Sequence, residues 1–158
     1  MKTNARDFPT VEVAVTIISK RRSKRILAVF NPRWGSFTLP MTKRKYWEDP
    51  KAPAANRPED IVISAVRAGA EVLGTTFDHA LLPKLLLREA HFHQSDSEGK
   101  WKRYDLHIFG LQVSAKTRFA PCTFVEWLTP ADFAAREPVS GTARFVIALL
   151  QKEGKLPP

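Results

Sequence analysis

The sequence predicts a single mixed α/β domain in which helices pack on a β-sheet. Strand-like segments occupy the beginning and the second half of the chain, one helical segment lies between them, and another lies near the C-terminus. This order of strands, helix, strands and helix is typical of layered mixed domains. At 158 residues the chain is long enough to bury a core without disulfides or metals. We expect one domain over residues 1–158, with its core at about 11–152.

The composition is typical of a soluble globular protein, with 44% apolar and 26% charged residues. No apolar run reaches the roughly 18 residues that a membrane span needs. The N-terminus has no apolar signal-peptide core. Cys122 is the only cysteine, which excludes an internal disulfide. We therefore expect a cytoplasmic protein that has no membrane partner.

The first strands are predicted on β-branched segments. Residues 11–18 alternate between more and less apolar side chains, and residues 25–30 follow after a short polar segment. Two strands joined in this way indicate a hairpin. Residues 31–36 have the chemistry of a turn, and Phe37–Leu39 is a short extended piece.

The central part of the chain predicts a loop followed by a helix. Prolines interrupt residues 43–58, which we expect to form a loop. Pro58 suits the first turn of a helix, and the two acidic residues after it complement the positive end of the helix dipole. The helix is expected to run to about Leu73 and to end at Gly74.

The second half predicts further strands and a terminal helix. Residues 80–89 are apolar with an ambiguous period, so a buried strand and a short helix both fit. Tyr104–Val113 and Phe124–Leu128 have the pattern of strands. Thr129–Asp132 is a helix-start signal, and Gly141–Lys152 has the apolar spacing of an amphipathic helix.

The central helix carries the most specific motif. Residues 59–74 read E-D-I-V-I-S-A-V-R-A-G-A-E-V-L-G. This segment resembles the Nudix box, G-x5-E-x7-R-E-U-x-E-E-x-G-U, where U is a bulky aliphatic residue. Glu59, Arg67, Glu71 and Gly74 match four of the nine specified positions.

Flanking segments extend the resemblance over roughly residues 11–152. Trp34 and Leu39–Pro40 resemble the W-x-x-L-P-G-G approach to the box, and residues 125–130 resemble the strand-then-helix entry near the end of such domains. The resemblance to the Nudix hydrolase superfamily implies a single-domain Nudix-like fold, a mixed β-sheet sandwiched between helices. It also implies structural roles for Arg67 and Gly74. Because many relatives are dimers, a homodimer is one expectation.

The approach to the box departs from the family pattern. Met41 and Thr42 stand where the family has two glycines. If Thr42 takes the place of the box glycine, the loop to Glu59 is 11 residues longer than usual. If the spacing is kept, the glycine position falls on Pro53. In both alignments the tight turn that glycine permits is absent in its usual form.

The box itself has lost carboxylates, because Ala68 and Val72 replace two of its three helix glutamates. The resemblance implies that box carboxylates hold Mg²⁺ or Mn²⁺. The metal ion would bridge diphosphate oxygens and activate a water molecule. Such cations need several anionic oxygens that converge on one point. Helical periodicity predicts a chemical face with one remaining carboxylate, formed by Ile61, Ser64, Ala68, Glu71 and Val72. It predicts a core stripe formed by Val62, Ile63, Val66, Gly69, Ala70 and Leu73.

Glu71 and Glu59 are the candidate catalytic and metal-binding residues, and Glu126 is a further candidate metal ligand from a neighbouring strand. An ion pair with Arg67 is the alternative role for Glu71, and favouring the helix N-terminus is the alternative for Glu59. His91 and His93 would share one side of a strand. With Asp96 or Glu98 they could form a replacement metal site, although such histidines are more often surface residues.

The candidate ligand-binding residues are cations and aromatic side chains near the box or in polar loops. Tryptophans could stack on a nucleobase, although packing in the core or an interface is the alternative for each. The candidates are Arg33, Trp34, Lys43, Trp47 and Trp101.

The net charge of +9 is unevenly distributed. Residues 1–58 hold 13 Lys and Arg against four Asp and Glu, whereas residues 59–158 are balanced. Clustered cations attract phosphate-bearing partners, and a solvated loop is the alternative. The cluster at the predicted hairpin tip consists of Lys20, Arg21, Arg22, Lys24 and Arg25.

Three functions follow, in decreasing order of preference. The first is a module that binds a nucleotide or another phosphorylated small molecule with weak or no hydrolysis. The second is a divergent pyrophosphohydrolase that uses Mg²⁺ or Mn²⁺ and acts on nucleoside-diphosphate-linked compounds. The third is a nucleic-acid or protein interaction domain that uses the basic hairpin.

Overall fold

The protein is seen here as a computed structural model that describes residues 10–47, 50–52, 57–74, 82–94, 99–121 and 123–156. Its main element is a seven-stranded mixed sheet whose principal order is β3-β2-β1-β8-β7, while β4 pairs with β1 and β9 pairs with β2. The strands are β1 (Thr10–Lys20), β2 (Ile26–Asn31), β3 (Ser36–Thr38), β4 (Met41–Lys43), β5 (Tyr46–Trp47), β6 (Arg57–Pro58), β7 (Lys84–Gln94), β8 (Trp101–Val113) and β9 (Val125–Leu128). The helices are α1 (Ile61–Leu73), α2 (Pro130–Ala135) and α3 (Gly141–Lys152).

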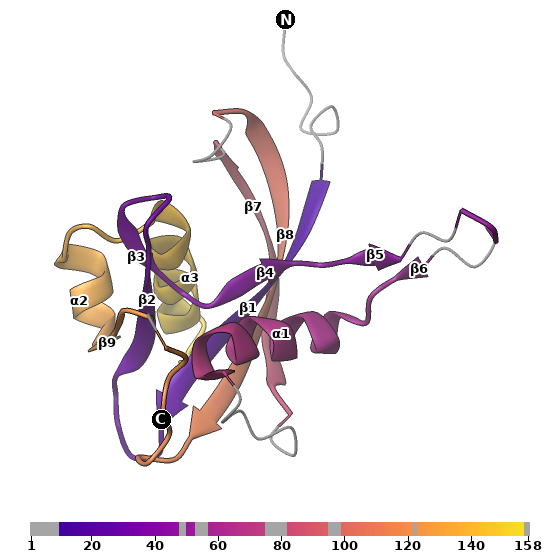
Figure 1. Ribbon diagram of the computed structural model, residues 1–158. Helices are drawn as coiled ribbons and strands as arrows, with labels where there is room; N and C mark the ends of the chain where they lie inside the picture. Colours follow the sequence, from indigo (N-terminus) through magenta and orange to yellow (C-terminus); the bar gives the residue numbers. More distant parts are fainter. Residues whose placement is uncertain are drawn as a thin grey trace, which may run out of the picture.

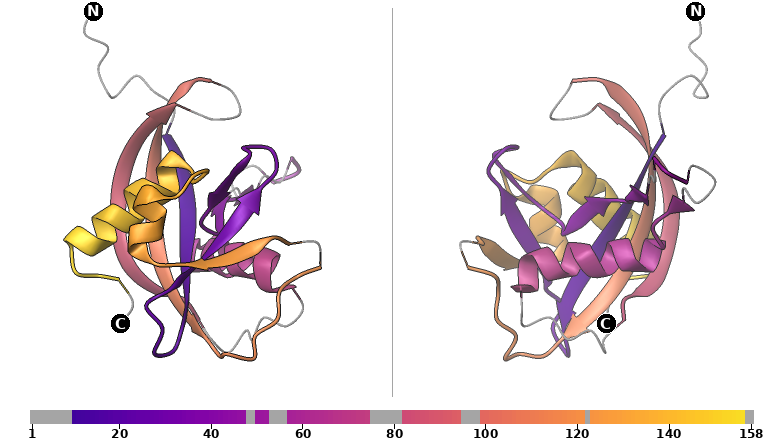
Figure 2. Two further views of the ribbon diagram at one scale, coloured as in Figure 1. Left: turned by 90° about the vertical axis from the view of Figure 1, so that its left-hand side faces the viewer. Right: turned by 45° about the vertical axis from the view of Figure 1, so that its right-hand side comes forward.

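The sheet lies between helices, as expected from the resemblance (Figures 1 and 2). Strand β1 supplies both faces, because successive side chains of a strand point to opposite sides. Val15 and Ile17 belong to the core cluster that includes Val146 of α3. Ala14 packs in a separate cluster with Ala65 of α1. The mixed sheet with helices on both faces is therefore confirmed.

One edge of β1 is shared by two diverging strands. Near its beginning β1 pairs with β4, where Val13 faces Lys43, and near its end it pairs with β2, where Ser19 faces Ile26. The backbone N–H of Thr16 donates to the carbonyl of Pro40 at 2.9 Å. The sheet is thus forked at this edge, whereas on the other edge β1 pairs in parallel with β8 along its whole length.

Helix α1 begins and ends at defined caps. The side chain of Asp60 accepts a hydrogen bond from the N–H of Val62 at the N-terminus. Gly74 follows the last turn with a φ of 63°, a conformation that favours glycine. The expected end at Leu73 and Gly74 is confirmed. The expected start is wrong, because Pro58 lies in β6 and the helix begins three residues later.

The predicted core stripe of α1 is correct only in part. Gly69 and Leu73 are buried, and Val62, Val66 and Ala70 pack against the core. Ile63, however, is 49% exposed, whereas Ala68 and Val72 of the predicted chemical face are buried. The reason is a close approach between helix and sheet, in which the hydroxyl of Thr16 donates to the carbonyl of Ala65 at 2.9 Å. Small side chains are needed on the contacting face, which buries Ser64, Ala65, Ala68, Gly69, Val72 and Leu73.

Residues 43–58 are not entirely a loop. Lys43 ends β4, and β5 and β6 pair as a small two-stranded sheet. They form an arm that extends from the main sheet (Figure 1). Pro58 can be accommodated in β6 because this strand is only two residues long. Proline has no backbone N–H, and here no long ladder of hydrogen bonds between strands requires one. The alternative position of the box glycine, Pro53, lies outside the described residues.

The ambiguous apolar segment forms part of a strand. Residues 84–94 make β7, which pairs with β8 and lies at the edge of the principal strand order. The other predicted elements of the second half are confirmed as β8, β9, α2 and α3. Thr129 and Asp132 form the reciprocal capping box at the start of α2.

Ser140 fixes α3 to β3. Its buried hydroxyl donates to Thr38 at 2.9 Å and accepts from the N–H of Ala143 at 3.1 Å. Ser140→Ala is expected to lower the free energy of unfolding by about 1 to 2 kcal/mol, because the cap and the link to the sheet are both lost. Urea denaturation followed by circular dichroism measures this loss. The exposed Ser114→Ala should change stability by less than about 0.5 kcal/mol, and an equal loss in both variants would contradict the assigned role.

Candidate ligand-binding site

Glu59 and Arg67, two of the residues that match the box, form a salt bridge. Their closest atoms, Oε1 of Glu59 and Nη2 of Arg67, lie 2.9 Å apart, and Nε of Arg67 donates to Oε2 at 3.0 Å. Ser64 donates a further hydrogen bond to the carboxylate at 2.6 Å. Glu59 is only 5% exposed, so its charge is buried but well matched by donors.

Arg67 also links the helix to β4. Its guanidinium donates to the hydroxyl of Thr42 at 3.3 Å and to the carbonyl of Lys43 at 3.0 Å. Thr42 stands where the family has a glycine, so this departure adds a hydrogen-bond acceptor that glycine lacks. The backbone N–H of Glu59 donates to Lys45 at 2.7 Å. Together these bonds hold the N-terminal half of α1 against the end of β4.

The electrostatics of the pair favour an ionised Glu59. Hydrogen bonds from Arg67 hold the pKa of Glu59 at about 2, below its ordinary value of 4.5, although burial acts in the opposite direction. Arg67 pairs with Glu59 and not with Glu71, which was the alternative partner expected for it. The geometry supports the structural role expected for Arg67. The catalytic and metal-binding roles of Glu59 and Glu71 stay predictions.

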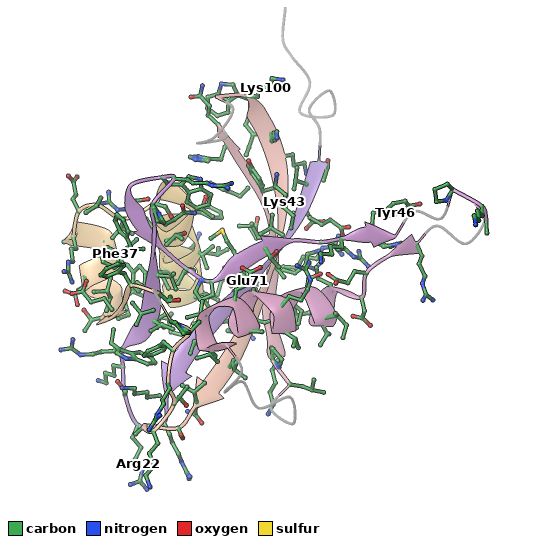
Figure 3. All side chains as sticks on the ribbon, in the orientation of Figure 1. Arg22, Phe37, Lys43, Tyr46, Glu71 and Lys100 are labelled. Atoms are coloured by element: carbon green, nitrogen blue, oxygen red, sulfur yellow. The ribbon has the colours of Figure 1, made fainter. Side chains whose placement is uncertain are left out.

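A cleft of about 820 Å³ lies beside this structural pair. It opens at the forked edge of β1 and reaches the C-terminal half of α1, which supplies Ala68, Glu71 and Val72. Figure 3 shows Glu71 and Lys43 in this central part of the molecule. Its volume lies in the range of small-molecule sites. The lining includes Val13, Val29–Trp34, Thr38–Lys43, His93, Tyr104, Leu106, Thr123, Phe124 and Thr142.

Three of the five predicted ligand-binding residues line the cleft, namely Arg33, Trp34 and Lys43. The side chain of Asn31 accepts from the N–H of Arg33 at 3.0 Å, which shapes the turn after β2. The sequence did not identify Phe124 as a lining residue. It is 74% exposed and lies just before β9, whereas the sequence predicts it as the first residue of that strand. Its position at the start of the expected strand, next to a polar threonine, was the available signal.

The charges at the cleft favour an anionic ligand. Among the described lining residues, the basic side chains are Arg33, Lys43 and His93, and Glu71 is the acidic one. Both Arg33 and Lys43 are exposed, so their charges reach the solvent at the entrance. Aromatic side chains at Trp34 and Phe124 add faces on which a planar group can stack.

The remaining candidates lie elsewhere or outside what is described. Trp101 stacks on Phe92 with their ring centroids 5.3 Å apart and does not line the cleft. Glu126 on β9 forms a salt bridge with Arg136. The side chain of Trp47 lies outside the described part of the chain, as does Cys122. The ligand and metal roles predicted for these residues stay predictions.

His91 and His93 occupy one side of β7, as their spacing predicts. Their rings stack with centroids 5.3 Å apart, and His91 also stacks on Phe145 of α3 at 4.0 Å. Burial lowers the pKa of His91, with a smaller contribution from His93. Both contacts are those of packed side chains. Asp96 and Glu98, the other members of the predicted replacement site, lie outside the described residues.

A second polar cluster was not anticipated. Glu12, Asp105 and His107 converge because β1 and β8 run in parallel with Glu12 opposite Asp105. Nε2 of His107 lies 3.4 Å from Glu12, while Arg44 and Arg88 form salt bridges with the two carboxylates. The hydrogen bond from Arg88 lowers the pKa of Asp105. In the sequence, the only sign of this cluster is that Asp105 and His107 are two residues apart and therefore lie on the same side of a strand.

The described lining residues of the cleft do not provide the donor set that Mg²⁺ or Mn²⁺ requires. Glu71 is the acidic side chain among its described lining residues, and the neighbouring box positions are methyl-bearing Ala68 and Val72. Hard divalent cations need several converging oxygen ligands. The one group of three converging acidic or histidine ligands found among the described residues is the β1–β8 cluster, whose carboxylates already hold arginines.

Removing Arg67 tests the buried pair. Arg67→Met is expected to lower the free energy of unfolding by about 3 kcal/mol. This is the lower end of the loss seen when one partner of a buried ion pair is removed, because the side chain of Arg67 is itself 26% exposed. The double variant Glu59→Gln/Arg67→Met should be more stable than Arg67→Met alone, since no buried charge is left without a partner. Chemical denaturation of the four proteins in the mutant cycle gives both values.

A matched control for this cycle is Arg57→Met, which removes an exposed arginine from β6. It should change stability by less than about 0.5 kcal/mol. The assigned pair would be contradicted by strictly additive losses in the double variant.

Glu59 also predicts how stability depends on pH. Because its pKa is lower in the folded protein, at about 2 against 4.5, the unfolded chain takes up the proton first as pH falls. The stabilisation is complete above about pH 4.5 and is lost as the pH falls towards 2. Denaturation at several pH values should show the advantage of the wild type over Glu59→Gln shrinking in this window. A difference that stays constant from pH 6 to pH 2.5 would contradict the assignment.

The geometry can be compared with that of known proteins. No protein-family model and no curated protein matches the sequence. Among solved structures, the chain is similar to the MutT protein from Methanosarcina mazei, with 14% identity and a TM-score of 0.64 over 94% of this chain and 98% of that one. It is also similar to the E. coli dihydroneopterin triphosphate pyrophosphohydrolase, with 15% identity and a TM-score of 0.62 over 90% and 95% of the two chains.

A further similar structure is the C-terminal domain of mouse MUTYH, solved in a complex with human PCNA, with 14% identity and a TM-score of 0.57 over 91% and 89% of the chains. At sequence identities this low, the structural similarity is evidence for the fold alone. The described residues contain no helix long and apolar enough to cross a membrane. The forked mixed sheet between helices, the matched box and these similarities together show that the chain has the fold of the Nudix hydrolases.

Proposed function

We propose that the cleft binds a nucleotide or another phosphorylated small molecule and hydrolyses it weakly or not at all. The observation that carries this proposal is the composition of the cleft: two exposed cations and stacking aromatic side chains surround about 820 Å³, with a single carboxylate among the described lining residues. Phosphate groups are held by Arg and Lys, and planar bases stack on aromatic rings.

The separation of roles within the box supports binding over hydrolysis. Glu59 and Arg67 are committed to each other and hold the helix on the sheet. Glu71 lines the cleft, but Ala68 and Val72 beside it offer no oxygen ligands. A single carboxylate completed by water holds Mg²⁺ weakly. The ligand is therefore held by direct contacts with cations, and its binding does not depend on a divalent metal.

Hydrolysis is the second candidate, and the position of Glu71 favours it. Its carboxylate is exposed and lines the cleft, so it can meet a metal ion that arrives bound to a diphosphate ligand. The similarity to a pyrophosphohydrolase concerns the fold. A fold by itself does not determine a reaction, so the two candidates are separated by experiment.

Binding is tested by calorimetric titration of nucleoside mono-, di- and triphosphates, with the matching nucleosides as ligands that lack phosphate. We expect binding of a phosphorylated ligand in both EDTA and Mg²⁺, and about tenfold weaker binding by Lys43→Gln because a charge-assisted contact is lost. The control Lys45→Gln removes a neighbouring exposed lysine that does not line the cleft. It should bind within about twofold of the wild type. Equal losses in both variants would contradict a specific role for Lys43.

Turnover is measured on the same compounds with Mg²⁺ or Mn²⁺ by the release of phosphate or pyrophosphate. The proposal expects no release above that of Glu71→Gln. Metal-dependent turnover that Glu71→Gln abolishes, and that the exposed control Glu89→Gln keeps, would replace the binding function with hydrolysis.

A further inference from the structure

We propose that the tip of the β1–β2 hairpin binds the phosphodiester backbone of nucleic acid without regard to base sequence. The tip is residues 20–25, which read K-R-R-S-K-R. None of them lines the cleft. In Figure 3 Arg22 lies at the lower end of the molecule, well away from Glu71 and Lys43. The proposed surface is therefore separate from the proposed ligand site.

The tip concentrates positive charge. It holds five cations in six residues, and the sequence contains no acidic residue between Glu12 and Glu48. Strand β8 ends beside it, because Val113 is in register with Lys20. The segment that follows β8 adds the exposed Lys116, and the sequence has no acidic residue between Asp105 and Glu126. Clustered charge of this kind attracts polyanions.

The outer two cations of the tip are anchored on one tryptophan. Nζ of Lys20 lies over the ring of Trp127, 4.4 Å from its centroid, and Nη1 of Arg25 donates to the carbonyl of Trp127 at 3.2 Å. Within the tip, the N–H of Ser23 donates to the carbonyl of Lys20 at 3.1 Å. The turn is therefore held at both ends. Its middle presents Arg21, Arg22 and Lys24, all exposed, to the solvent.

Arg22 occupies an unfavourable backbone conformation. Its φ of 64° lies in the left-handed region, where glycine and asparagine are more easily accommodated than long side chains. Strained residues of this kind are found where their side chains serve a function. The side chain of Arg22 points away from the fold and into the solvent (Figure 3).

The chemistry of the tip suits nucleic acid better than a membrane. Guanidinium groups form paired hydrogen bonds with phosphate oxygens. Membrane-binding surfaces combine cations with apolar side chains that insert between lipids, and residues 20–25 contain no large apolar side chain. The exposed large apolar side chains of the described residues lie outside the tip, at Tyr46, Ile63, Leu82, Leu85, Phe92, Trp101 and Phe124.

The test measures binding of fluorescently labelled 20-base-pair duplexes of two unrelated sequences, by anisotropy at several NaCl concentrations. The tip variant is Arg21→Gln/Arg22→Asn/Lys24→Gln. The control variant is Lys45→Gln/Arg57→Gln/Lys100→Gln, which removes the same charge from exposed positions elsewhere. Figure 3 shows Lys100 at the end of the molecule opposite Arg22.

We expect the wild type to bind both duplexes with similar affinity and a steep salt dependence. The tip variant should bind at least about tenfold more weakly, and its slope of log affinity against log salt should be shallower by roughly two to three, since each phosphate contact contributes about 0.9. The control variant should stay within about threefold of the wild type. The thermal unfolding midpoints of both variants should match or exceed that of the wild type. In the tip variant, Arg22→Asn relieves backbone strain.

Three outcomes would overturn the proposal. Equal weakening of duplex binding in the tip and control variants would show that net charge alone accounts for the binding. Absence of duplex binding at 50 mM NaCl would exclude the activity. Binding to vesicles of phosphatidylserine and phosphatidylcholine that the tip variant loses, without duplex binding, would assign the surface to a membrane instead.

Discussion

The fold of this protein depends on neutralising one buried carboxylate. Glu59 loses most of its contact with water, and such a burial is tolerated only when a cation and hydrogen-bond donors replace the solvent. Arg67 supplies the cation and also reaches the backbone of β4. The start of α1 and the end of β4 are therefore held together by one charge pair. The cleft forms beside this pair, so its shape depends on that contact.

The cleft also depends on the way β1 divides its pairing. A strand that kept one neighbour along its whole edge would close the sheet at this point. Here β4 and β2 take opposite ends of the same edge, and the space between them is lined from strands and helix alike. Small side chains on α1 let the helix lie close to β1 while Glu71 remains at the opening. One helix thus packs on the sheet and also supplies part of the cleft wall.

The sequence predicted the fold better than the site, for physical reasons. Alternation in β1 and β8, and the glycine after Leu73, are local signals that tertiary contacts did not override. The buried face of α1 was predicted only in part, because hydrophobicity favours Ile63 over Ser64, whereas the close approach to Thr16 requires small side chains. Pro58 was placed in the helix because proline suits both a helix start and a short strand. The cleft could be foreseen only in part, since Phe124 and Lys43 reach the same cleft through pairing between distant segments.

The burial of Ala68 and Val72 limits how a metal site could be built in the cleft. Both line the cleft while remaining almost completely covered, so a glutamate at either position would bring a charge into a poorly hydrated wall beside Glu71. One such replacement adds repulsion before it adds a metal site, because a single pair of carboxylates is a weak ligand set. A divalent-cation site in this wall would therefore require two coordinated substitutions, because the first alone introduces repulsion without binding an ion.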